Sequence, residues 1–123
     1  MRIIADAAVA LVALLHLYFL LLEMFLWTRP FGMKTFGLTP EFAAASRGLA
    51  ANQGLYNGFI AAGLAWSVFL GSDPISVFFL GCVIVAGVFG AITASRKILW
   101  VQALPGIVAL GLVWYASPRG IFF

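Results

Sequence analysis

Apolar residues are gathered into four long runs that short polar segments separate. The runs cover Ile4–Trp27, Leu49–Leu70, Ile75–Ser95 and Ile98–Ala116. Each run holds about the twenty residues that a helix needs to cross a hydrocarbon core about 30 Å thick. The pattern predicts an all-α integral membrane protein, a bundle of four transmembrane helices that forms a single domain over residues 1–123.

The connections between the runs differ in length. The second and third are short, so the last three helices are expected to be antiparallel neighbours. The first, Thr28–Gly48, contains several prolines and glycines and is expected to begin as irregular chain. Thr39 then offers a capping hydroxyl before a proline, which predicts a short amphipathic helix over residues 40–48. We expect this helix to lie at the membrane interface and to lead into the second span.

Composition agrees with a membrane location. Of the 123 residues, 64% are hydrophobic and 9% are charged, with a mean hydropathy of +1.11. Soluble domains are about a quarter charged. The net charge of +3 comes mainly from the connections, so it bears on orientation, and nucleic acid is not expected as a partner.

The basic residues of the connections predict the orientation. Arg29, Lys34 and Arg47 lie in the first connection and Arg96 and Lys97 in the third. The second connection has no basic residue. Because basic residues accumulate in cytoplasmic loops, the first and third connections are expected inside. Both termini are then outside, despite the basic residues at positions 2 and 119.

Two ionisable residues, His16 and Glu23, interrupt the first apolar run. Seven residues are close to two helical turns, so both side chains are expected on one side, about 10 Å apart along the axis. Ionisable groups within a membrane helix are costly and mark functional sites by default. A histidine and a glutamate could also exchange protons, so both are candidate catalytic residues. The alternative is a structural salt bridge of Glu23 with Arg47 or Arg96.

The second apolar run begins with polar side chains spaced four residues apart, which form two adjacent stripes on one side of a helix. In the predicted topology they lie in the same cytoplasmic half as Glu23. We therefore expect a polar pocket that opens to the cytoplasm, with His16 at its floor. The candidate ligand-binding residues are Asn52, Gln53, Tyr56, Asn57, Arg47, Arg96 and Gln102.

Small residues recur at a spacing of four, as in Gly54/Gly58 and Ala86/Gly90. Such pairs allow helices to approach closely, either within one bundle or between subunits. A thin bundle of this size is expected to form a homo-oligomer, a dimer or a trimer. A single histidine and a single cysteine (Cys82) do not build a closed metal site, so no metal is predicted and any cofactor is left open.

Several segments together resemble a domain-of-unknown-function family of small bacterial four-helix inner-membrane proteins. These are residues 16–18, 23–27, 36–38, 51–58, 95–97 and 102–105, of which Ala51-Asn-Gln-Gly-Leu-Tyr-Asn-Gly58 is the most specific. The resemblance implies a multi-pass protein of the bacterial inner (plasma) membrane. It implies no activity.

The run Arg47-Gly-Leu-Ala-Ala51-Asn-Gln also looks like the start of the second helix in membrane-associated eicosanoid and glutathione metabolism proteins. That resemblance implies a trimer with a cytoplasm-facing site between subunits. Arg47 would correspond to their arginine, and Asn57 falls where some members carry a glutamate. Gly54 stands in place of their asparagine and their paired tyrosines have no counterpart, so the resemblance predicts a similar architecture and no function.

These observations leave three functions open. The pocket could bind or transform a small amphiphilic molecule, with membrane lipid around it. The protein could instead be a small multidrug-type or proton-coupled transporter, although the nearly apolar outer half argues against access from both faces. It could also be a membrane scaffold or partner subunit.

Overall fold

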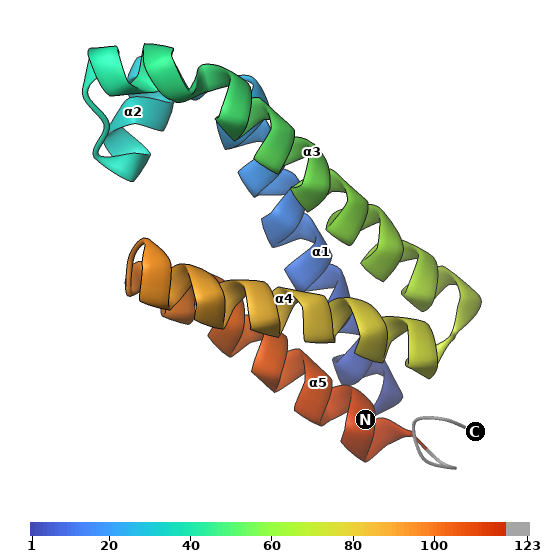
Figure 1. Ribbon diagram of the computed structural model, residues 1–123. Coiled ribbons are helices and arrows are strands. Elements are labelled where there is room, and N and C mark those ends of the chain that lie inside the picture. The colour runs from blue at the N-terminus through green and yellow to red at the C-terminus, as the bar shows by residue number, and fades with distance from the viewer. Residues whose placement is uncertain (118–123) are drawn as a thin grey trace. The chain divides into compact units, whose positions relative to one another are not determined.

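The computed structural model describes residues 1–117, and every regular element in that range is a helix (Figure 1). The elements are α1 (Arg2–Met24), α2 (Pro30–Phe36), α3 (Pro40–Leu70), α4 (Asp73–Thr93), the π-helix η1 (Leu99–Ala103) and α5 (Leu104–Ala116). The all-helical prediction is therefore confirmed for this range. Arg119, which entered the prediction of orientation, lies outside the described residues.

Three segments of the described chain are long and apolar enough to cross a membrane: α1, α4, and η1 continued by α5. These segments indicate a membrane protein. The longest helix, α3, has 31 residues but carries Asn52, Gln53 and Asn57 in its interior, which lower its hydropathy. A fourth span within α3 and the orientation of the termini stay predictions.

Contacts divide the chain into two compact units. Within the described residues, the first contains Met1–Ala13 and residues 62–117, and the second contains Leu14–Ala61. Both α1 and α3 contribute to each unit, because each helix continues through the boundary.

The connection after α1 differs from the prediction. We expected irregular chain followed by a short helix over residues 40–48. The short helix is instead α2, and α3 begins at Pro40 and continues without a break. Pro30 occupies the first turn of α2, where its missing N–H does no harm, and Gly37 ends the helix with φ 65°. The predicted cap of the next helix is confirmed, because the Thr39 hydroxyl accepts a hydrogen bond from the Phe42 amide at 3.1 Å.

In the second unit, α2 is held against the chain on either side of it. Gly32 is buried so closely against the Leu26 carbonyl that a Cβ atom would collide with it. The Trp27 indole donates a hydrogen bond to the Ser46 hydroxyl of α3 at 3.0 Å, and its ring lies 5.0 Å from that of Phe36. These contacts fix the short helix between the end of α1 and the start of α3.

In the first unit, a chain of hydroxyl groups joins α3 to α4. The Ser76 hydroxyl donates to that of Ser67 at 2.7 Å, and Ser67 in turn donates to the Leu64 carbonyl at 2.6 Å. Both serines are buried. Between them, Gly71 ends α3 with φ 66° and Ser72 caps α4.

The π-helix η1 precedes a proline at position 105, which cannot donate a helical hydrogen bond to the carbonyl four residues earlier. Within η1 the Leu104 amide bonds to the Leu99 carbonyl, five residues back. This wider turn puts Ile98 and Ala103 on the same side of the chain, where Ile98 lies against Gly90 and Ala103 against Gly87, both of α4.

Candidate functional site

Glu23 is the buried carboxylate of the second unit. Glu23 lies in the last turn of α1 and is only 5% exposed. Its side chain accepts a hydrogen bond from the Asn57 amide of α3. A carboxyl group in an apolar interior is costly unless it is hydrogen-bonded. The structure therefore brings together two of the predicted site residues and makes one the partner of the other.

Glycines on α3 allow this contact. A Cβ atom at Gly54 would lie 2.6 Å from the Met24 side chain and 3.1 Å from Cβ of Glu23. One at Gly58 would lie 2.7 Å from the Leu20 side chain. The pair Gly54/Gly58 thus serves close packing of α3 on α1 within one chain, one of the two roles that its spacing predicted.

His16 is fully buried, and its ring meets Phe19 of the same helix edge to face at 5.3 Å between centroids. Since Glu23 is buried too, both lie on the inner side of α1, as their spacing predicted. Two helical turns separate them by about 10 Å along the axis. Proton exchange between the two groups stays a prediction.

The other predicted residues of the second unit face outward. Asn52, Gln53 and Tyr56 are exposed on α3, and the Tyr56 ring stacks edge to face with Phe59 at 5.7 Å. Arg47 is also exposed. The structure describes every residue of the second unit, and Arg47 forms no ion pair with Glu23 there. The salt bridge with Arg47 that we considered for Glu23 is absent, because Asn57 takes that place.

Arg96 and Gln102 belong to the first unit. Arg96 is exposed in the short connection after α4, and Gln102 is half-buried within η1. Their part in a site with Glu23 stays a prediction.

The sequence analysis missed an ion pair at the start of α1. The Arg2 guanidinium contacts both carboxylate oxygens of Asp73, at 2.9 and 3.1 Å, and also lies 3.4 Å from Asp6. The signal available in the sequence was the opposite charge of Arg2 and Asp73. Arg2 lies at the start of α1 and Asp73 at the start of α4, and antiparallel packing of successive helices brings these two starts to the same side.

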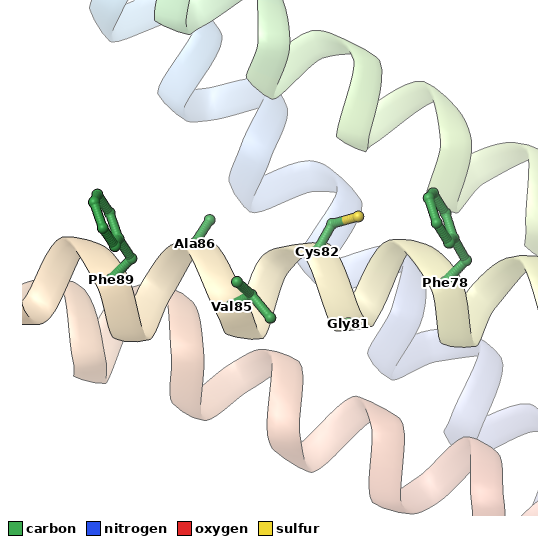
Figure 2. Close-up of a pocket in the computed structure, with 6 residues that line it drawn as sticks. All are labelled: Phe78, Gly81, Cys82, Val85, Ala86 and Phe89. Carbon is green, nitrogen blue, oxygen red and sulfur yellow. The ribbon is translucent and has the colours of Figure 1, made fainter.

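A shallow apolar groove follows one side of α4 (Figure 2). It is lined by Phe78, Gly81, Cys82, Val85, Ala86 and Phe89. Small residues lie between the two phenylalanine rings, and the Cys82 thiol is free and half-buried. An outward apolar surface of this kind suits contact with lipid chains and holds none of the predicted site residues.

Within residues 1–117, no three histidine, cysteine or acidic side chains lie close enough together to hold a metal ion. In the second unit, the buried polar side chains are those of His16 and Glu23, and the Asn57 amide bonds to Glu23. These groups can bind a polar head group and hold or accept a proton.

Comparison with known proteins places the chain among its relatives. Residues 10–114 match the family described as protein of unknown function (DUF1304). The chain is 31% identical over 114 residues to the uncharacterized protein YpaA of Lactococcus lactis subsp. lactis (strain IL1403), covering 89% of this chain and 96% of that protein. No solved structure matches. The likeness to the eicosanoid and glutathione proteins stays a prediction, whereas the resemblance to a bacterial family of unknown function is confirmed. The chain belongs to the DUF1304 family.

Proposed function

We propose that this protein is a multi-pass protein of the bacterial inner membrane that binds a small amphiphilic molecule, with its polar head group at Glu23 and Asn57. The observation that carries the proposal is the buried carboxyl group of Glu23 inside an apolar helix, partnered by an amide of the facing helix. An ionisable group at such a place marks a functional site by default.

The hydrogen-bonding capacity of Glu23 supports a ligand. An ionised carboxylate offers about four acceptor sites, whereas an asparagine amide has two donor hydrogens. The bond from Asn57 occupies one of the carboxylate oxygens. Glu23 therefore keeps capacity for the hydroxyl or amine of a head group, and His16, two turns deeper, lies where the ligand would enter apolar surroundings.

The outward polar side chains of α3 support both a head-group site and an oligomer. Polar side chains that face lipid are costly, so Asn52, Gln53 and Tyr56 need polar partners if this part of α3 lies in a membrane. The head group of the ligand or the same stripe of a second copy would supply them. We accordingly propose a homo-oligomer in which this stripe is covered.

Contacts at the two ends of α1 support α3 as the fourth span. In the first unit, Arg2 at the start of α1 contacts Asp73, just beyond α3. In the second unit, Glu23 at the end of α1 contacts Asn57 in α3. Both pairs are those expected if α3 runs antiparallel to α1, and each of the two helices is continuous. If α1 crosses the membrane, α3 accompanies it back, and the basic residues of the connection between them favour a cytoplasmic turn.

A second candidate function is a scaffold or partner subunit. The contact between Glu23 and Asn57 favours it, because one amide can satisfy a protonated or weakly solvated carboxyl group without any ligand. In that case Glu23 would stabilise the packing of α1 and α3 alone.

Native mass spectrometry of the protein extracted gently from its own membrane distinguishes the two. We expect a retained small molecule that disappears in Glu23→Gln, since glutamine keeps the contact with Asn57 but removes the acid. Ser67→Ala is the matched control, because it alters a buried polar contact of the first unit and should keep the molecule. A protein that carries only exchangeable bulk lipid in all three forms would contradict ligand binding and favour the scaffold.

A further inference from the structure

The segment between α1 and α3 presents aromatic rings and basic side chains outward. Phe25, just after α1, is 62% exposed, and Phe31 of α2 is 56% exposed. Arg29 and Lys34 are exposed as well. Figure 1 shows α2 in the connection that joins α1 to α3. We call residues 25–37 the loop platform.

The loop platform is ordered by its own contacts. Gly32 lies against the Leu26 backbone, and Trp27 contacts both Phe36 and Ser46. On α2, Phe31 and Lys34 are three residues apart, so these exposed side chains share one face of the helix. A ring and an ammonium group are therefore held side by side, which lowers the entropy lost when both engage one surface.

The basic side chains of the loop platform are unpaired within the described part of the chain. Among residues 1–117, neither Arg29 nor Lys34 takes part in an ion pair. The platform itself contains no acidic residue. Its basic groups are thus available for an external anion.

The position of the loop platform indicates which kind of anion its basic side chains meet. It begins one residue after α1, which ends at Met24 and is long and apolar enough to cross a membrane. A spanning α1 therefore delivers the platform to the membrane surface. Basic side chains interspersed with exposed aromatic rings are typical of segments that bind anionic lipid at that depth.

We infer that the loop platform binds the head groups of anionic phospholipids, with Arg29 and Lys34 on the phosphates and Phe25 and Phe31 among the upper acyl chains. The inference rests on the proposed membrane crossing of α1 and does not depend on the amphiphile site. Arg47 is left out because it belongs to the candidate site residues.

Trp27 makes this inference measurable, because it lies within the platform. The variant W66F/W100F/W114F keeps Trp27 as the only tryptophan, and all three replaced residues are exposed. The protein is placed in phosphatidylcholine vesicles containing a minority of brominated phosphatidylglycerol, or of brominated phosphatidylcholine, and quenching of Trp27 is compared. Each basic residue near an anionic surface strengthens binding about fivefold, so we expect a preference for phosphatidylglycerol of roughly tenfold or more.

Adding R29Q/K34Q to this background should bring the preference close to one. The matched control compares two single variants, K34Q and K97Q, each of which removes one exposed lysine charge. K34Q should lower the preference about fivefold, whereas K97Q, in the connection after α4, should leave Trp27 quenching unchanged. Equal quenching by both lipids in the unmutated platform would overturn the inference, and so would an equal loss of preference in K34Q and K97Q. Absence of quenching by either lipid would place the platform away from the membrane and overturn it as well. None of these results depends on Glu23.

Discussion

Two of the polar contacts that join helices within residues 1–117 are built differently. In the first unit, Ser76 donates to Ser67, and Ser67 donates to a backbone carbonyl of its own helix. In the second unit, the carboxyl group of Glu23 accepts from Asn57. The serine chain ends on the backbone and uses neutral groups, so it needs nothing further. The Glu23 contact includes an ionisable group with acceptor capacity left over.

The difference separates packing from function. Two hydroxyl groups can join helices at little cost in an apolar surrounding, because both can turn to bond their own backbone. A carboxyl group brings a large desolvation penalty that a neutral side chain avoids. If packing were the only requirement at Glu23, a serine or a small apolar residue would meet it more cheaply. The contrast is the reason for placing the ligand at Glu23 and for treating Ser67 as the control.

The largest effect is expected from Asn57→Leu, which leaves the buried Glu23 without its donor. We predict that the free energy of unfolding falls by about 2–3 kcal/mol, since a buried charged or polar group deprived of its partner bears its full desolvation penalty. Denaturation with SDS in mixed micelles, followed by far-UV circular dichroism, measures this change. Glu23→Gln, which keeps a partner for Asn57, should change stability by less than about 1 kcal/mol. An equally large loss in both variants would mean that the acid itself stabilises the fold.

The next largest change in the free energy of unfolding is expected from glycine substitutions, which compare helix packing in the two units. At Gly54 a Cβ atom would meet Cβ of Glu23 and, at 3.3 Å, the Leu20 carbonyl, so Gly54→Ala has to push backbone apart. At Gly63 the atoms in the way belong to the Phe79 ring, the rotatable end of a side chain. We predict a loss of about 1–2 kcal/mol for Gly54→Ala.

The matched variant Gly63→Ala should be near neutral, because rotation about the Cα–Cβ bond of Phe79 can move the tip of its ring away, and alanine favours a helix over glycine by up to about 1 kcal/mol. The same SDS titration compares both. If Gly63→Ala proved the more harmful, the close approach of α1 and α3 beside Glu23 would not be the tighter of the two packing contacts.

A smaller loss than that of Gly54→Ala is expected from Ser67→Ala. It removes the acceptor of the Ser76 hydroxyl, but that hydroxyl can rotate to the Ser72 carbonyl one turn earlier. Hydrogen bonds between membrane helices contribute about 0.6 kcal/mol on average, so we predict a loss of under about 1 kcal/mol in the same titration. A loss as large as that of Asn57→Leu would remove the distinction between the two contacts.

The elements were predictable where a single stretch of sequence decides them. Apolar runs located the helices, and Thr39 with Pro40 gave the start of α3, whose cap is present. For α2 the signals existed, since Pro30 and Gly37 suit the start and the end of a short helix. We read them as breaks in the chain because the same residues also mark turns.

Pairings between distant residues were not predictable to the same degree. Glu23 and Asn57 were both candidates. Which donor contacts the carboxyl group depends on the position of α3 along α1, and the close contacts of Gly54 and Gly58 with α1 fix that position. Arg2 and Asp73 are far apart in the chain, and their pairing requires knowledge of the antiparallel packing. The sequence also supplied no cue for the extra residue in η1 beyond the proline that follows it.

The π-helix has a consequence for changes of chain length. Leu99–Ala103 accommodates one residue more than an α-helical turn would, and that residue keeps Ile98 against Gly90 while Ala103 meets Gly87. Deleting one residue there would restore α-helical spacing but turn the chain after it by about 100°. The buried side of α5, which includes Ala109 and Val113, would then rotate away from its contacts. Substitutions at exposed positions of this segment, such as Trp100 and Val101, leave the direction of α5 unchanged, whereas a single-residue deletion changes the face that the whole last helix presents.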